Sequence, residues 1–225
     1  RAASSATAGK IVPLSPMRRA IAEATASSWR SIPLVALNST ATIDRLLAMD
    51  VPLTAAIGRA TALALAGHGS FNGWLLEPGF KQCSTVEMGF AISTGSGLVT
   101  AVIGRAEHKS IEEIDAELRD CSQKARQGLL PGGRMVGGSF TVSSLGRWGV
   151  DSFDPIISAP QVAILGVGRI ARKAREAADG GCVFASEIGL TLVFDHRAND
   201  GVEAALLLKD IVERLENPET LEAGR

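Results

Sequence analysis

The 225-residue chain lacks the features that mark several classes of protein. Its formal net charge is only −1, so it has no excess of positive charge that would bind nucleic acid or an anionic membrane. No apolar run approaches the ~20 residues that a transmembrane helix needs. Its three cysteines are scattered and lack the spacing of metal ligands: Cys83, Cys121 and Cys182. We therefore expect no metal site, and we expect each of these cysteines to be a buried structural thiol. The composition agrees with a folded enzyme domain in a reducing compartment such as the cytoplasm.

The first residues differ in composition from the rest of the chain. Residues 1–9 are rich in Ala, Ser, Thr and Gly and show no hydrophobic periodicity, which is typical of a flexible linker. They are too polar for the apolar core of a secretory signal, although a frayed start or a cloning remnant would have a similar composition. Residues 10–225 are long enough for one domain with a substantial core. We therefore predict a linker at 1–9 and one folded domain at 10–225.

Capping residues and hydrophobic patterns predict one α/β domain. Ser15 can cap a helix that has Pro16 in its first turn, and Ser110 with Glu113 forms the capping box of another helix. Further helices are predicted at residues 53–66 and 202–215. The predicted strands are residues 33–43, 86–94, 98–103, 139–144, 162–167 and 189–194. The Gly/Pro clusters at 131–133 and 178–181 are predicted to be loops.

The motif with the clearest chemistry lies near the C-terminus. His196 stands four residues before Asp200, and Asp200-Gly201 directly precedes an apolar, helix-like stretch. Histidine is the side chain best able to take a proton near neutral pH. An aspartate followed by glycine suits a tight turn and the start of a helix. His196 is therefore a candidate general base, although a turn with a hydrogen-bonded histidine would show the same pattern.

A second motif points to a different function. Residues 166–171 match the Gly-x-Gly-x-x-Ala fingerprint of dinucleotide-binding folds, and they follow a predicted strand. The next residues form a short charged segment that ends in glycines, instead of the long helix that would hold a pyrophosphate. We interpret this motif as a turn between two strands.

Several separated segments carry a resemblance to one known family. They are residues 13–22 (PLSPMRRAIA), 88–94 (MGFAIST), 97–99 (GLV), 109–114 (KSIEEI), 137–146 (GGSFTVSSLG), 160–168 (PQVAILGVG) and 194–201 (FDHRANDG). In sequence and in order, these segments resemble the dihydrolipoamide acyltransferases, the E2 components of 2-oxo acid dehydrogenase complexes. The resemblance covers about residues 11–217, extends distantly to chloramphenicol acetyltransferase, and implies that residues 10–225 are an acyltransferase catalytic domain. The resemblance implies a two-layer α/β sandwich of the chloramphenicol acetyltransferase type, in which a mixed β-sheet packs against helices.

The resemblance also implies a reaction, the transfer of an acyl group between a dihydrolipoyl thiol and coenzyme A. A thiol of pKa ~8.5 is mostly protonated at pH 7 and attacks only as the thiolate. His196 matches the base that would deprotonate it. Ser143 matches the hydroxyl that would stabilise the oxyanion, whereas Ser144 should point to the opposite face of the strand. Asp200 is implied to support the site through an arginine near the first helix, with Arg18 as the better candidate.

Partners and surroundings follow from the same resemblance. It implies a homotrimer with active sites between subunits, which can assemble into a larger cage. The implied partners are the E1 and E3 components and a separate domain that carries the lipoyl group, with coenzyme A as substrate. The compartment would be the cytoplasm, or the mitochondrial matrix in a eukaryote. No nucleic acid or membrane partner is expected.

Differences from the family pattern leave the acyl group open. Ala101 stands where the family often has proline, residues 68–74 depart from its usual His-Pro-x-Leu-Asn-Ala before tryptophan, and the stretch between Asp44 and Leu53 is shorter than usual. The acyl group could be acetyl, succinyl or branched-chain. Two alternatives also remain, namely a freestanding coenzyme A-dependent acyltransferase for a small alcohol or amine, and a scaffold subunit without turnover.

Overall fold

The structure, a computed structural model, describes residues 10–95, 97–177 and 180–222, so the predicted linker at residues 1–9 lies outside the described residues. The helices of the described part are α1 (Pro16–Ser31), α2 (Asp44–Ala48), α3 (Leu53–Gly67), α4 (Ile111–Arg126) and α5 (Gly201–Glu216). Its strands are β1 (Leu34–Thr42), β2 (Gly73–Leu76), β3 (Gly79–Gln82), β4 (Met88–Thr94), β5 (Gly97–Ile103), β6 (Phe140–Ser144), β7 (Ala163–Glu176) and β8 (Cys182–Asp195). None of the described helices is long and apolar enough to cross a membrane.

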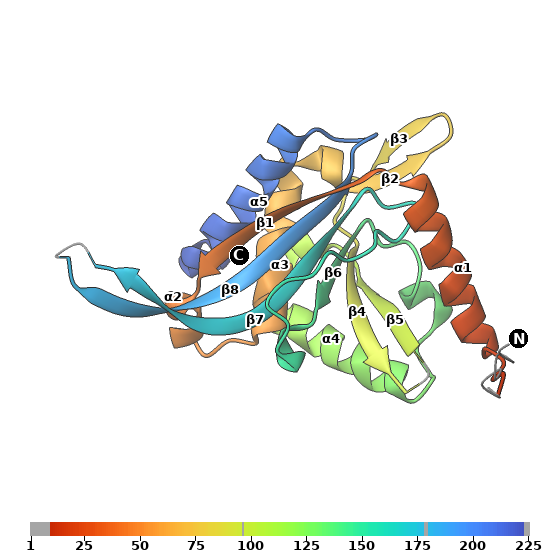
Figure 1. Cartoon of the computed structure of the whole chain (residues 1–225), viewed down its shortest axis with the longest axis horizontal. Helices are drawn as coiled ribbons and strands as arrows, with labels where there is room; N and C mark the ends of the chain where they lie inside the picture. Colours follow the sequence, from red (N-terminus) through yellow and green to blue (C-terminus); the bar gives the residue numbers. More distant parts are fainter. Residues whose placement is uncertain (1–9, 96, 178–179, 223–225) are drawn as a thin grey trace, which may run out of the picture.

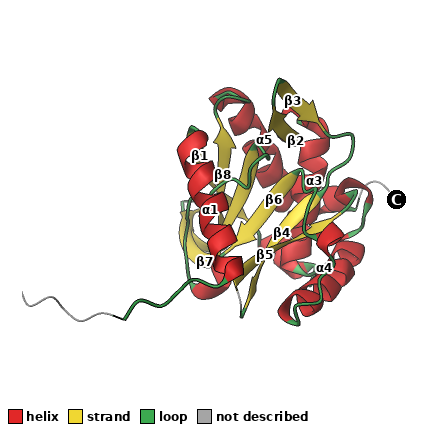
Figure 2. Cartoon of the chain, turned by 90° about the vertical axis from the view of Figure 1, so that its right-hand side faces the viewer, coloured by secondary structure: helices red, strands yellow, loops and turns green. Residues whose placement is uncertain are grey.

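Six strands form one mixed sheet in the order β1-β8-β7-β6-β4-β5. Strand β6 is parallel to both of its neighbours, β4 and β7, whereas the other pairs are antiparallel. Strands β2 and β3 form a separate hairpin. Helices α3, α4 and α5 cover one face of the sheet, and α1 lies on the other side near β5 (Figures 1 and 2). This arrangement confirms the predicted layers of helices and mixed sheet.

The central strands are buried on both faces, which explains their continuous apolar sequence. Val142, Leu165 and Phe194 face the helices and belong to the main core. Ile164 and Val193 point to the opposite face, where they pack with Ile32 and Ile157. Successive side chains of each strand therefore point to opposite faces of the sheet, and both faces are apolar.

The predicted helix starts are confirmed by their caps. The Ser15 hydroxyl accepts a hydrogen bond from the Arg18 backbone N–H at 3.2 Å. Ser110 and Glu113 form the predicted capping box of α4, and Asp200 is the N-cap of α5. Each cap satisfies backbone groups that have no partner within the helix, which is why local sequence locates these boundaries well.

Strands β7 and β8 extend far beyond the predicted 162–167 and 189–194. Residues 170–176 pair with residues 182–188, and together they form a ribbon that projects from the body of the molecule (Figure 1). The ribbon has a charged sequence, but charge pairs across its strands support it. Glu187 is buried, its carboxylate accepts a hydrogen bond from Arg175, and the Lys173 Nζ lies 3.4 Å away.

The interpretation of residues 166–171 as a turn is wrong. These residues continue along β7, with an irregularity in the register between Val167 and Ile170. A Cβ on Gly168 would lie 1.9 Å from the backbone oxygen of Asp151, so the glycine allows the 150–152 segment to pack directly on the strand. The Gly-x-Gly pattern therefore serves backbone packing, and no helix follows it.

Candidate active site

His196 lies in a turn that directly follows β8. Its backbone N–H donates to the Pro33 oxygen at 3.1 Å, which ties the turn to the segment that begins β1. The backbone N–H groups of Ala198 and Asn199 donate to the Asp195 oxygen at 3.0 and 3.2 Å. Because the last six residues of β8 are buried, the backbone beneath His196 is fixed from the core side.

The imidazole of His196 is accessible, since 48% of its side chain is exposed. Its Nδ1 lies 3.9 Å from the Asp200 Oδ1, which is longer than a direct hydrogen bond. The ring packs against Phe194, with 5.7 Å between ring centroids. Asp200 is itself largely exposed, and its backbone N–H donates to the Glu203 Oε2 at 3.5 Å. The structure therefore brings the predicted base and carboxylate close together at the start of α5.

The residues on either side of His196, Asp195 and Arg197, form an ion pair with each other. The Asp195 side chain is buried and accepts hydrogen bonds from the Arg197 guanidinium at 2.6 and 2.9 Å. This hydrogen bonding raises the pKa of Arg197. The pair braces the turn, and sequence reasoning missed it, although opposite charges on both sides of a histidine were a readable signal.

Ser143 and Ser144 face opposite sides of β6, as predicted. Ser144 is exposed and lines a cavity between the sheet and the helices. Ser143 is half-buried and shares the other face with Thr141, whose hydroxyl donates to the Gln161 Oε1 at 2.8 Å. The two hydroxyls are therefore presented to different surroundings.

Within one chain, Ser143 and His196 are far apart. Ser143 is opposite Gly166, and Gly166 is opposite Thr191. Thr191 precedes His196 by five residues, which at ~3.3 Å per residue corresponds to about 17 Å along the strand. A hydroxyl at that distance cannot contact a group that reacts at the imidazole.

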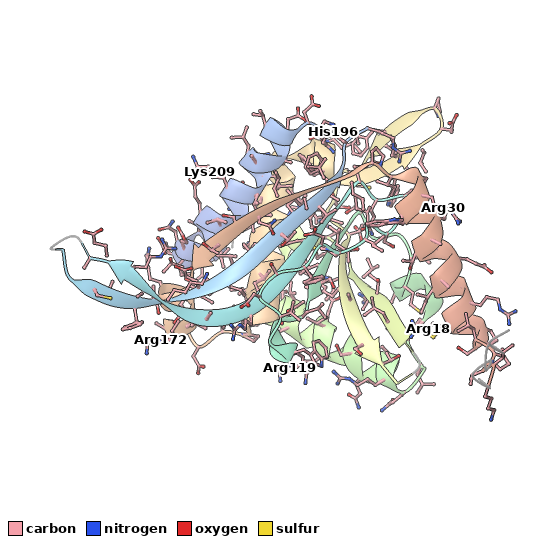
Figure 3. The ribbon with its side chains drawn as sticks, in the orientation of Figure 1. Arg18, Arg30, Arg119, Arg172, His196 and Lys209 are labelled. Atoms are coloured by element: carbon pink, nitrogen blue, oxygen red, sulfur yellow. The ribbon has the colours of Figure 1, made fainter. Side chains whose placement is uncertain are left out.

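Arg18 is also remote from the residues that it was predicted to support. Its guanidinium lies beside Gly97, at the start of β5. Figure 3 shows Arg18 at the lower right and His196 at the top, on separate parts of the molecule. The structure does not bring Arg18 and Asp200 together within one chain.

A cavity of about 690 Å³ lies where β4 and β6 separate. The two strands pair only over residues 88–90 and 140–142, so a gap opens beyond them. Its walls are mainly apolar, and the apolar residues include Leu53, Ile57, Phe90, Val142, Val167 and Ile188. Three exposed arginines also line it: Arg126, Arg147 and Arg169. The cavity could hold a molecule with an apolar part and negative charges.

The arginines of this cavity have different neighbours. Arg169 Nε lies 2.5 Å from the Asp151 Oδ1, and this hydrogen bond raises the pKa of Arg169. The Arg147 guanidinium lies over the Trp148 ring, 5.1 Å from its centroid. Within the described part of the chain, Arg126 and Arg147 form no ion pair. These two arginines are therefore available to an anionic ligand.

The cysteines carry no sign of catalysis. Cys121 is buried and Cys83 is half-buried, and burial raises the pKa of both thiols. Cys182 is exposed, which corrects the expectation of a buried thiol. Its strand belongs to the projecting ribbon, and no local pattern of residues reveals that ribbon. The described residues contain no cluster of His, Cys, Asp or Glu that could hold a metal ion.

The layers and strand order define a known class of fold. A solved chloramphenicol acetyltransferase superposes with a TM-score of 0.55 at 14% identity, covering 85% of this chain and 91% of that one. The family model of the 2-oxoacid dehydrogenases acyltransferase (catalytic domain) matches residues 6–223. The chain therefore belongs to this acyltransferase family, which confirms the predicted family and fold.

Solved structures and curated relatives agree with this assignment. The cubic core of a pyruvate dehydrogenase multienzyme complex superposes with a TM-score of 0.93 at 27% identity, covering 97% of this chain and 96% of that one. Dihydrolipoamide acetyltransferase from Azotobacter vinelandii gives a TM-score of 0.91 at 27% identity, covering 96% of this chain and 94% of that one. The mitochondrial dihydrolipoyllysine-residue acetyltransferase component of the pyruvate dehydrogenase complex of Caenorhabditis elegans is 32% identical over 93% of this chain. That match covers 45% of the relative, so the chain spans less than half of its length.

Proposed function

We propose that this chain transfers an acyl group between a dihydrolipoyl thiol and coenzyme A, as the catalytic domain of an E2 component. The observation that carries the proposal is the accessible imidazole of His196, held at the end of a buried strand with Asp200 beside it. The structural study of the Azotobacter vinelandii enzyme concerns a serine, a histidine and an asparagine in its catalytic mechanism, the last two four positions apart. His196 and Asp200 have the same spacing.

The proposed reaction exchanges one thioester for another. The imidazole of His196 accepts the proton of the attacking thiol, and the resulting thiolate forms a bond to the thioester carbonyl carbon. The carbonyl oxygen of the tetrahedral intermediate then carries the negative charge, and the Ser143 hydroxyl donates a hydrogen bond to it. The carbon–sulfur bond to the original thiol breaks, and that sulfur recovers the proton from His196. The acid and base are thus regenerated in each turnover, and no metal is required.

The cavity beside Ser144 supports coenzyme A as the second substrate. Its apolar walls suit the pantetheine arm, and its volume of about 690 Å³ is in the range of pockets that hold such ligands. Arg126 and Arg147 are exposed on its lining and would bind the phosphates. The dihydrolipoyl group would arrive on a separate domain.

The distance between Ser143 and His196 supports a site shared between copies. Because the two side chains lie on the same sheet about 17 Å apart along its strands, they meet at one thioester only if neighbouring copies supply them. A head-to-tail interface that closes after three copies gives a homotrimer. The same arrangement would allow Arg18 of one copy to approach Asp200 of another. Helix α1 has a single buried residue, Ser28, which leaves most of its surface available to a neighbour.

The wider biological setting follows from the same proposal. Trimers of this chain would form a larger core, as in the cubic pyruvate dehydrogenase core that it resembles. The E1 and E3 components and a lipoyl domain would be its partners, in the cytoplasm or, in a eukaryote, in the mitochondrial matrix. The named relatives favour acetyl as the acyl group.

Mixing two inactive variants tests the shared site. His196→Ala and Ser143→Ala should each transfer from acetyl coenzyme A to dihydrolipoamide at least about 100-fold more slowly than wild type. In a mixed trimer, the first variant supplies an intact Ser143 and the second an intact His196, so some sites are rebuilt. Co-refolding should therefore restore a measurable part of the wild-type rate, with gel filtration confirming that mixed trimers form. No recovery in confirmed mixed trimers would contradict the shared site.

The alternatives are separated by the choice of acceptor. Wild-type protein that acetylates a small alcohol or amine but not dihydrolipoamide would be a freestanding acyltransferase of the same fold. Protein that transfers to neither acceptor would be a scaffold. Succinyl and branched-chain acyl coenzyme A, compared with acetyl coenzyme A by kcat/KM, identify the acyl group.

A further inference from the structure

The side chain of Asn199 is the buried polar anchor of the turn that carries His196. Asn199 is only 3% exposed, whereas the His196 and Asp200 side chains are 48% and 84% exposed. Its Nδ2 donates to the backbone oxygen of Ser70 at 3.1 Å. Ser70 lies in the short 3-10 helix Gly69–Phe71, which follows α3. The amide therefore ties the histidine turn to a segment 129 residues away in the sequence.

This anchor matters because the imidazole has few contacts of its own. Within the described residues, the contacts found for the ring are Phe194 at 5.7 Å and Asp200 at 3.9 Å, and neither is a hydrogen bond at normal length. The direction of the ring therefore depends on the backbone of the turn. That backbone is held to Pro33, directly before β1, and to the 3-10 helix through Asn199. The Asp195–Arg197 pair braces the turn within itself, whereas the Asn199 amide joins it to a separate segment of the fold.

The Asn199 amide makes its described contact through its nitrogen. Its Oδ1 is buried and has no hydrogen-bond partner within the described residues, and an unpaired buried acceptor lowers stability. A leucine of similar size would avoid this cost but could not donate to Ser70. The hydrogen bond from Nδ2 to Ser70 is therefore what distinguishes the amide from an apolar side chain at this position.

We propose that Asn199 is a positioning residue, which holds His196 in its working orientation through the hydrogen bond to Ser70. The proposal rests on the proposed function, in which His196 is the general base. A small displacement of a catalytic group lowers the rate strongly while substrate binding is retained. The amide would therefore act on kcat and leave KM largely unchanged.

The test replaces the amide with an apolar side chain of similar size. Asn199→Leu should lower kcat for transfer to dihydrolipoamide by about 10- to 100-fold, with both KM values within about twofold and little change in the thermal unfolding midpoint. Asn199→Gln keeps an amide donor on a longer side chain and should recover part of the lost rate. The matched control is Thr61→Val. Thr61 is also a buried polar residue, and its hydroxyl donates to the backbone oxygen of Ile57 within α3 instead of contacting the turn. This control should lower stability and leave kcat unchanged.

A double variant separates this proposal from the assignment of the base. If Asn199 acts through His196, Asn199→Leu should cause no further loss in a His196→Ala background. A full additional loss in that background, or wild-type kcat for Asn199→Leu alone, would overturn the positioning role. Near-normal turnover of His196→Ala alone would instead overturn the proposed function, whatever the behaviour of Asn199.

Discussion

The two ends of β8 are built in opposite ways. Its last six residues are buried, with main-chain pairing to β1 on one side and β7 on the other, and His196 follows directly. Its first three residues are exposed on the projecting ribbon, where charge pairs around Glu187 contribute to the support. The comparison shows that one strand can fix the position of His196 at its buried end while its other end is exposed to solvent. Substitutions at the buried end should therefore affect turnover, and those on the ribbon should affect stability alone.

The largest effect is expected at the buried end. His196→Ala should lower kcat for acyl transfer by about 10²–10⁴-fold, because it removes the proposed acceptor of the thiol proton. Since the imidazole is half exposed and outside the core, circular dichroism and the unfolding midpoint should stay close to wild type. His108→Ala, which removes another exposed histidine, is the control and should retain full activity. Near-normal turnover of His196→Ala at neutral pH would exclude it as the base.

The next effect separates the two faces of β6. Ser143→Ala should lower kcat by about 10²–10³-fold with little change in either KM, as expected for a donor to the oxyanion. Ser144→Ala, on the cavity face, should change the KM for coenzyme A more than kcat. If Ser144→Ala instead lost kcat while Ser143→Ala was harmless, the cavity face would carry the oxyanion donor.

A smaller effect is expected at the cavity. Arg147→Ala should raise the KM for coenzyme A by roughly 10-fold, because charge-assisted hydrogen bonds to phosphate are among the stronger polar contacts. The KM for dihydrolipoamide should not change. Arg119→Ala, an exposed arginine of α4 that does not line the cavity, serves as the control. An equal rise in both KM values would argue against a coenzyme A site there.

The smallest effect is expected on the ribbon, in stability at low pH. Burial, the largest single influence, raises the pKa of Glu187, but Arg175 and Lys173 together outweigh it and hold the pKa below its ordinary value of 4.5. A carboxyl with a lowered pKa stabilises the fold above its unfolded pKa, and this contribution is lost as the pH falls through the folded value. Wild-type protein should therefore lose stability on acidification below about pH 4.5, and Glu187→Gln should show a weaker loss.

Thermal unfolding midpoints at pH 7 and pH 4 provide the measurement. The control is Glu176→Gln, a carboxylate exposed on the same ribbon, which should keep the wild-type dependence on pH. Both variants should keep wild-type kcat at pH 7. A large loss of turnover in Glu187→Gln would mean that the two ends of β8 are coupled more closely than their construction indicates.

The parts of the fold that local sequence encodes were predictable. Ser15, Ser110 and Asp200 satisfy backbone groups within a few residues of themselves, so three helix starts could be predicted. The length of β7 and β8 could not be predicted. The charged residues of β7 in the ribbon are stabilised by Glu187 on β8, which is a contact between strands. The motif around Gly168 was interpreted wrongly for a similar reason. Gly168 allows close contact with the Asp151 backbone, and no residue nearby in the sequence reveals that contact.

The site divides in the same manner. His196 and Asp200 are four residues apart, so their proximity could be predicted from spacing. The separation of Ser143 from His196 depends on the register of three strands, and the bond from Asn199 to Ser70 joins residues 129 positions apart. The cavity exists because two parallel strands pair over only three residues each. These features arise from the tertiary arrangement and have no local signature.

The pairing of β1 with β8 sets the order in which the molecule can be completed during synthesis. Leu34 pairs with Asp195 and Thr42 with Glu187, so β1 leaves the ribosome about 150 residues before its neighbour is made. At ~5–20 residues per second this delay lasts about 8–30 s. During that time the edge of β1 that later pairs with β8 has no partner, and an unpaired strand edge is prone to aggregation. The histidine turn is translated immediately after Asp195. The imidazole of His196 therefore reaches its position when β8 pairs with β1 and completes the sheet. A shorter nascent chain lacks β8 and cannot fix the position of the imidazole.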